Sequence, residues 1–249
     1  MSKETLAILG GKKLGVLAQP PFPTFSKRAV KRVAANLEKG QVLGLGLSSP
    51  EIKEAEQAIS KFHGGLHAMG TASGHGALQS SLAGLEVGPG DEVITTPYTW
   101  GASISCILHQ NAIPIFADVK KDTGLLDPDT IEALITSRTK AILVVHIYGQ
   151  PADMTKIMKI ARKHNLVVVE DGSQAHGATW KGTPVGNFGD AAGFSCMGGK
   201  LLATIEAGYM VTPHEEVLWR GGMIGQHMGR LQDRSCVDEL KPYTDSLVY

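Results

Sequence analysis

The sequence predicts an α/β protein with three layers, in which helices cover both faces of a mostly parallel sheet. The first observation is that strand-like segments, such as residues 141–145 and 167–169, are continuous apolar runs without polar alternation. Strands of that kind are buried on both faces, as in parallel sheets. The second is that helical patterns of about 10–15 residues separate these runs, as crossovers between parallel strands require. The 249 residues are enough for one large domain of this class.

The composition argues against two classes of partner. Hydrophobic residues make up 43% and charged residues 19% of the chain, which is ordinary for a globular protein. Basic and acidic residues balance at 24 each, so neither nucleic acid nor a membrane is an expected partner. No apolar run approaches the ~20 residues of a membrane helix, and no secretory signal is visible. Cys106, Cys196 and Cys236 are far apart and read as reduced thiols, which predicts a cytoplasmic protein.

The first 25 residues are predicted to form an N-terminal arm, and residues 26–249 a large domain. The arm ends in the proline-rich stretch 19–23, which excludes helix. Ser26 then has the character of a helix N-cap, with apolar residues at helical spacing up to a stop at Gly40. A second helix is predicted over Pro50–Phe62, with proline in its first turn.

From there the pattern alternates between strands and helices. In open α/β sheets ligands bind at the carboxyl ends of the strands, so polar residues that follow a strand are site candidates. The last two strands are close enough in sequence to pair antiparallel. Strands are predicted at 66–69, 92–95, 113–116, 141–145, 167–170, 191–195 and 209–211, and helices after the turn 70–76 up to residue 85 and at 101–110, 128–135 and 154–164.

A glycine-rich loop after the strand 191–195 contains a single lysine, Lys200. A lysine in an apolar loop is disfavoured unless its amine has a chemical task, most often as the nucleophile of a Schiff base. The spacing of Gly193 and Gly198 suits a phosphate-binding P-loop. That motif fails, because Gly199 intervenes before the lysine and Leu201 replaces the hydroxyl residue. A glycine-rich turn with an exposed lysine remains the alternative.

The turn that includes Gly74 and His75 follows a strand and opens a helix. Backbone amides and the helix dipole at such a turn favour a phosphate, although glycine is also common there for steric reasons alone. The glycine spacing does not match a dinucleotide-binding fingerprint. No metal site is predicted, since Gly64-Gly65 separates His63 from His67.

Four further residues follow predicted strands. Trp100 either stacks on a flat ring or packs in the core. Asp171 is a carboxylate at the end of a buried strand, which is costly without a cation, and a protonated ring nitrogen would pair with it. Gln174 is placed to bond a phenolic oxygen, and Ser195 precedes Lys200 by five residues. Together with the turn at Gly74 and His75, this set matches the parts of pyridoxal 5'-phosphate (PLP): aldehyde, ring nitrogen, ring oxygen, ring face and phosphate.

The segment from about residue 73 to 208 resembles the DegT/DnrJ/EryC1/StrS family, PLP-dependent aminotransferases of keto-sugars and keto-cyclitols. The more specific matches are Glu170 to Ala178 (E-D-G-S-Q-A-H-G-A) and the spacing from Phe194-Ser195 to Lys200. The other matching stretches are 88–94, 97–100, 139–142 and 146–153.

The resemblance implies the fold type I large domain and a catalytic site around Lys200, the lysine of the internal aldimine and the proton shuttle. It implies an amino group taken from glutamate or glutamine and passed to a keto-sugar or an inosose-like keto-cyclitol, in a homodimer. His176 and His227 are candidates for contact with substrate. The implied cofactor contacts are Asp171 with the ring nitrogen, Gln174 with the ring oxygen, Trp100 over the ring, and Ser195, Gly74 and His75 at the phosphate.

The sequence departs from the family pattern at three points. Residues 205–208 (I-E-A-G) replace the usual G-E-G-G, which is expected to stiffen the loop after Lys200. His75 stands where the family usually has threonine, which alters one phosphate contact. Relatives continue for well over a hundred residues beyond the region that matches, so the small C-terminal domain of the family is expected to be absent. One alternative is therefore a non-catalytic, aminotransferase-like binding or regulatory protein. A second keeps PLP but is a dehydratase–aromatase of the aminohydroxybenzoate synthase type. Lys200 argues against the related 3-dehydratases, which have histidine there.

Overall fold

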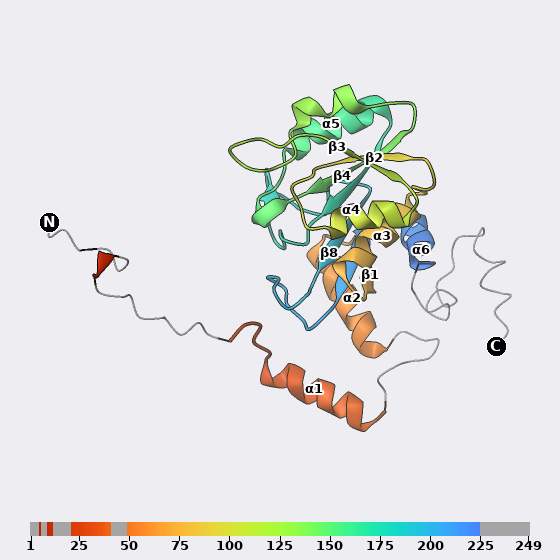
Figure 1. Ribbon diagram of the computed structural model, residues 1–249. Helices are drawn as coiled ribbons and strands as arrows, with labels where there is room; N and C mark the ends of the chain where they lie inside the picture. The colour runs from red at the N-terminus through yellow and green to blue at the C-terminus, as the bar shows by residue number, and fades with distance from the viewer. Residues whose placement is uncertain (1–4, 6–8, 12–20, 41–48, 225–249) are drawn as a thin grey trace.

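The computed structural model describes residues 5, 9–11, 21–40 and 49–224, which form a seven-stranded sheet with flanking helices (Figure 1). The strand order is β1-β9-β8-β5-β4-β2-β3, with a separate two-stranded ribbon β6-β7. The helices are α1 (Lys27–Glu38), α2 (Pro50–Phe62), α3 (Gly74–Gly84), α4 (Ala102–His109), α5 (Met154–His164) and α6 (Glu215–Gly222). The strands are β1 (His67–Thr71), β2 (Glu92–Thr95), β3 (Ile113–Phe116), β4 (Thr139–Val145), β5 (Val167–Asp171), β6 (Thr179–Trp180), β7 (Thr183–Pro184), β8 (Ala191–Ser195) and β9 (Gly208–Thr212).

The sheet is mostly parallel, which confirms the predicted class. Strands β3, β2, β4, β5 and β8 pair in parallel. Strand β9 pairs antiparallel with β8, as expected from the short connection between these two strands, and its other edge pairs antiparallel with β1. The side chains of β4 from Ala141 to Val145 are buried throughout, as their continuous apolar sequence predicts.

The helix boundaries follow from capping residues. The Ser26 hydroxyl accepts a hydrogen bond from the Ala29 amide at 3.1 Å, and α2 begins at Pro50 behind a Ser49 cap. Helix α1 lies apart from the sheet (Figure 1) and contacts α2 through Arg32, whose guanidinium lies 2.8 Å from a carboxylate oxygen of Glu54. The division into an arm of residues 1–25 and a domain of residues 26–249 stays a prediction.

One predicted helix is wrong. Residues 128–135 form two 3₁₀ turns, η2 (Pro128–Thr130) and η3 (Glu132–Leu134), instead of one α-helix. The Asp127 side chain does cap the first turn, at the amide of Asp129. The backbone bonds there join residues three apart, because the segment is short and rich in β-branched side chains that disfavour α-helix. The first strand is displaced from 66–69 to His67–Thr71, and the other shifts are of one or two residues.

A buried carboxylate near the end of β5 connects that strand to the residue after β4 and to the loop before β8. Glu170 and His146 have fully buried side chains, and Oε2 of Glu170 lies 3.0 Å from Nε2 of His146. Nδ1 of His146 accepts the Ala152 amide hydrogen at 3.0 Å, so the histidine proton is on Nε2 and the ring is neutral. Three more amides donate to the carboxylate, those of Gly186, Phe188 and Gly189.

These donors decide the charge state of Glu170. Burial opposes ionisation, but the bonds from His146 and from the backbone amides outweigh it, and the pKa of Glu170 lies below its ordinary value. A carboxylate is an acceptor at both oxygens, which is the only form that satisfies four donors.

We expect Glu170→Gln to lower the free energy of unfolding by about 2–4 kcal/mol, because its amide nitrogen would face hydrogen-bond donors in a buried site. Urea unfolding at pH 7 measures this, with the exposed Glu216→Gln as the matched control. A lowered pKa in the folded state stabilises the fold above the ordinary carboxyl pKa, and that stability is lost as the pH falls through the folded value. The difference between wild type and Glu170→Gln should therefore shrink in acid. Equal stability of the two proteins at pH 7 would contradict this account of Glu170.

Candidate active site

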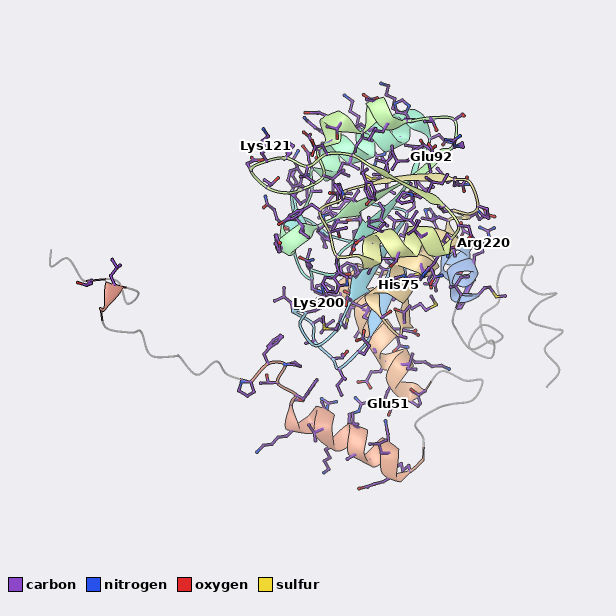
Figure 2. All side chains as sticks on the ribbon, in the orientation of Figure 1. Glu51, His75, Glu92, Lys121, Lys200 and Arg220 are labelled. Atoms are coloured by element: carbon purple, nitrogen blue, oxygen red, sulfur yellow. The ribbon has the colours of Figure 1, made fainter. Side chains whose placement is uncertain are left out.

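A cavity of about 420 Å³ lies where β5 and β8 end and α3 begins. It brings together all seven residues predicted to hold a cofactor, which come from five separate segments of the chain. Figure 2 shows two of them, Lys200 and His75, at this end of the sheet. The lining residues are Ser73, Gly74, His75, Thr99, Trp100, Ala102, Asp171, Ser173, Gln174, Ser195, Met197, Lys200 and Glu206.

The start of α3 and the end of β8 approach so closely that only glycine fits. A Cβ atom built on Gly74 would lie 2.5 Å from Cβ of Ser195, and one on Gly208 would collide with the carbonyl of Ser73. The Ser73 hydroxyl caps α3 by accepting from the Gly76 amide at 3.1 Å. The first amides of α3 have no acceptor within the helix, and Ser195 lies beside Gly74 at that end. The arrangement fits a phosphate group.

Asp171 closes the cavity at the end of β5. Its side chain is buried, and within residues 49–224 no cation forms an ion pair with it. Its two oxygens accept from the Ser103 hydroxyl at 2.6 Å and from the Ser173 amide at 3.0 Å. A buried carboxylate with only neutral donors fits a cationic ring nitrogen as a ligand.

The orientation of the Gln174 amide follows from its partner. The Tyr148 backbone N–H lies 2.7 Å from the side-chain oxygen of Gln174, and a backbone N–H always donates. The NH₂ group of Gln174 therefore remains available as a donor, which suits a phenolic oxygen. Tyr148 has a left-handed φ of 55° and its hydroxyl lies 3.0 Å from that of Tyr98.

The remaining two predicted contacts lie at the rim. Trp100 is 75% exposed and lines the cavity, so the alternative of a core tryptophan is wrong. Lys200 is partly buried and lines both this cavity and an adjoining one of about 250 Å³, which it shares with Tyr148 and Gln174. Lys200 is therefore not the isolated, exposed lysine of the alternative interpretation.

His75 lines the cavity as an uncharged residue. Its Nε2 atom is buried without a hydrogen-bond partner among the described residues, and its ring packs edge-on to His109 with centroids 4.9 Å apart. Burial lowers the pKa of His75, and the neighbouring His109 lowers it further. At neutral pH the imidazole is therefore neutral, and attraction to a phosphate falls to the backbone at this position.

The two substrate candidates are not among the lining residues. His227 lies outside the described residues. His176 packs its ring against Phe194 and Tyr209, with centroids 5.3 Å and 6.0 Å apart, and both of its ring nitrogens are buried without a partner in the described part of the chain. Burial, with the charge of Lys200 as the next cause, lowers the pKa of His176 to about 4. Contact of either histidine with a substrate stays a prediction.

The structure also adds four polar residues to the site that the motifs did not single out. Ser103 on α4 has a fully buried side chain in contact with Asp171, and the hydroxyl of Thr99 lies 2.8 Å from the hydroxyl of Ser103. Ser103 lies in the first turn of α4 and Thr99 lies just before that helix, so the hydrogen bond between residues four apart was the available local signal. The four are Thr99, Ser173 and Glu206, which line the cavity, and Ser103, which contacts Asp171 without lining it.

We expect His176→Phe to raise the free energy of unfolding at pH 7 by about 1 kcal/mol, because it removes two unpaired buried nitrogens. The pKa of His176 is lowered on folding from 6.5 to about 4, so the unfolded state binds the proton first as the pH falls. Between pH 6.5 and 4, the free energy of unfolding of the wild type should then fall by about 1–2 kcal/mol more than that of the variant. This figure is reduced because solvent has partial access to the ring. Urea unfolding across this range checks both statements, and parallel curves for the two proteins would refute the second.

Among the described residues, no helix is long and apolar enough to cross a membrane, and no group of three or more His, Cys, Asp or Glu side chains is arranged to hold a metal ion. The cytoplasmic location stays an expectation.

Known proteins are similar to this chain in sequence and in fold. Residues 23–236 match the model of the DegT/DnrJ/EryC1/StrS aminotransferase family. The L-glutamine:2-deoxy-scyllo-inosose aminotransferase of Streptomyces lividus is 38% identical over 213 residues, which are 84% of this chain and 50% of that protein. An aminotransferase structure from Psychrobacter cryohalolentis is 37% identical with a TM-score of 0.77, covering 81% of this chain and 51% of that one.

NtdA of Bacillus subtilis, with its cofactor PMP bound, is 30% identical with a TM-score of 0.72, over 84% of this chain and 48% of that one. The chain thus spans about half the length of the relatives it matches. The family match over most of the sequence identifies this chain as a member of the DegT/DnrJ/EryC1/StrS aminotransferase family.

Proposed function

We propose that this protein is a PLP-dependent aminotransferase that moves an amino group from glutamate or glutamine to a keto-sugar or an inosose-like keto-cyclitol. The observation that supports it most is that one cavity contains both Lys200 and Asp171, a buried carboxylate that lacks a cationic partner among the described residues. Relatives in the family bind PLP or its amino form, PMP, as NtdA does.

Each side chain would have one task. The Lys200 amine would attach the cofactor and then move a proton at its Nζ atom. Asp171 would hold the proton of the ring nitrogen, and the NH₂ group of Gln174 would donate to the ring oxygen. Trp100 would cover one face of the ring. The Ser195 hydroxyl and the amides of Gly74 and His75 would bind the phosphate. Bound here, PLP would supply an aldehyde that exchanges amino groups and a ring that withdraws electrons.

The substrate classes come from the relatives and from the cavity. The S. lividus relative is named for L-glutamine and 2-deoxy-scyllo-inosose, an amino donor and a cyclic polyhydroxy ketone. Tyr148 lines the adjoining cavity beside Lys200, and its hydroxyl, with that of Tyr98 bonded to it, is suited to hydrogen-bond such a ring. Both observations favour a glutamine or glutamate donor and a cyclitol or sugar acceptor.

Large exposed side chains in and near the two cavities favour a homodimer. Leu201 is 77% exposed and Ile205 is 84% exposed, close in sequence to Lys200. Trp100, which lines the main cavity, and Tyr148, which lines the adjoining one, are each 75% exposed. Clusters of this kind mark interaction sites.

We expect sedimentation equilibrium to give twice the monomer mass for the wild type. Ile205→Glu should shift the protein toward monomer, because it places a charge in the exposed apolar cluster. A wild-type monomer at all concentrations would exclude the dimer.

The central test follows the cofactor by absorbance. With added PLP, the wild-type protein should show a band at roughly 400–430 nm that glutamate or glutamine removes and a cyclic polyhydroxy ketone such as 2-deoxy-scyllo-inosose restores. Lys200→Ala should lack the band and any borohydride-fixed cofactor, because it has no amine at that point. Lys181→Ala, at an exposed lysine beside Trp180, is the matched control and should behave as wild type.

Two results would overturn parts of the proposal. A wild-type protein that forms no band excludes a PLP enzyme of this kind. A band that no amino donor removes excludes the transfer reaction, and it supports a protein that binds PLP without catalysis.

A further inference from the structure

The carboxylate of Asp171 is held from behind by a serine on another element. Ser103 lies in the first turn of α4, and its hydroxyl donates to Oδ2 of Asp171 at 2.6 Å. That distance is in the short range of hydrogen bonds to charged acceptors. The Ser103 side chain is fully buried, so no solvent competes for its hydroxyl.

The direction of the next hydrogen bond follows from this one. The Ser103 hydroxyl has a single hydrogen, which is donated to Asp171. The Thr99 hydroxyl, 2.8 Å from that of Ser103, must therefore be the donor of their shared bond. Thr99, Ser103 and Asp171 form a chain of hydrogen bonds in which every hydrogen is directed toward the carboxylate.

The same turn of α4 also contacts Trp100, the residue proposed to cover the PLP ring. The Ser103 amide donates to the carbonyl of Trp100 at 3.1 Å. One residue thus fixes both the carboxylate at the floor of the cavity and the backbone of the tryptophan at its rim. Cys106, one turn further along α4, is buried, and its thiol donates to the backbone carbonyl of Ser103.

The two neutral donors leave acceptor positions of the Asp171 carboxylate available for a ligand. Ser103 occupies Oδ2 and the Ser173 amide occupies Oδ1, one donor to each oxygen. A carboxylate has about four acceptor positions, so the remaining ones are available on the side of the cavity. A ligand that donates a charged N–H there meets an acceptor that is already oriented, and it does not have to order the side chain on binding.

We propose that Ser103, with Thr99 behind it, is a positioning residue that holds the Asp171 carboxylate toward the ring nitrogen of PLP. This inference rests on the function proposed above and names how the site selects a ring with a protonated nitrogen. Ser103 acts through Asp171 and does not touch the cofactor. Its contribution should therefore depend on the presence of that nitrogen.

The test compares PLP with its 1-deaza analogue, in which a C–H group replaces the ring nitrogen. Dissociation constants of both are measured from the absorbance of the Lys200-bound form and from tryptophan fluorescence. Ser103→Ala should weaken PLP about tenfold and the deaza analogue less than about twofold, because the analogue has no N–H for Asp171 to accept. Ser105→Ala, two residues further along α4, is the matched control and should change neither constant, because among the described residues the Ser105 hydroxyl bonds only to the backbone of its own helix, at 3.4 Å.

Two more variants separate positioning from packing. Ser103→Thr keeps the hydroxyl and should retain most of the preference for PLP over the analogue. Thr99→Val removes only the outer donor at nearly constant shape and should weaken PLP by about threefold with little change for the analogue. Equal weakening of both ligands by Ser103→Ala, or no weakening at all, would overturn the role of Ser103. A wild-type protein that binds no PLP at Lys200 would instead overturn the proposed function, and this inference with it.

Discussion

Two adjacent carboxylates at the end of β5 organise this part of the molecule. Neighbouring residues of a strand point to opposite faces, so Glu170 and Asp171 are directed away from each other. Glu170 accepts from four protein donors, which connect β5 to His146, directly after β4, and to the segment 186–189. Asp171 accepts from two donors only and borders the cavity. The first carboxylate supports the framework, and the second is positioned by that framework for a ligand.

The glycines around the cavity have a comparable consequence. Gly74 and Gly208 allow the start of α3 to approach β8 and β9 without room for a Cβ atom. The helix N-terminus is thereby brought beside Ser195 and within reach of the same cavity as Lys200. The proposed cofactor would place its phosphate at this position. His75 is neutral there, so the positive charge of the cavity is concentrated on Lys200.

Much of the fold and of the site could be predicted because its signals are local. Continuous apolar runs identified the parallel strands, and the polar residues that follow them, such as Asp171 and Gln174, met in one cavity as the topology of the sheet requires. What was missed depends on contacts distant in sequence. Ser103 is 68 residues from Asp171, and the neutral state of His146 depends on the Ala152 amide as well as on Glu170. The exposure of Trp100 is likewise a property of the surface around it. The segment 128–135 was wrong because helical periodicity cannot distinguish a short α-helix from two 3₁₀ turns.

The central claim is that Lys200 is the amine to which the cofactor is attached, because its cavity provides a partner for every other part of PLP. The most direct measurement is peptide mapping by mass spectrometry after equimolar PLP is reduced onto the protein with borohydride. We expect the pyridoxyl group on the peptide that contains Lys200, at close to one per chain, with little on exposed lysines such as Lys181. Labelling spread evenly over the exposed lysines, with Lys200 no more modified than the rest, would contradict the account.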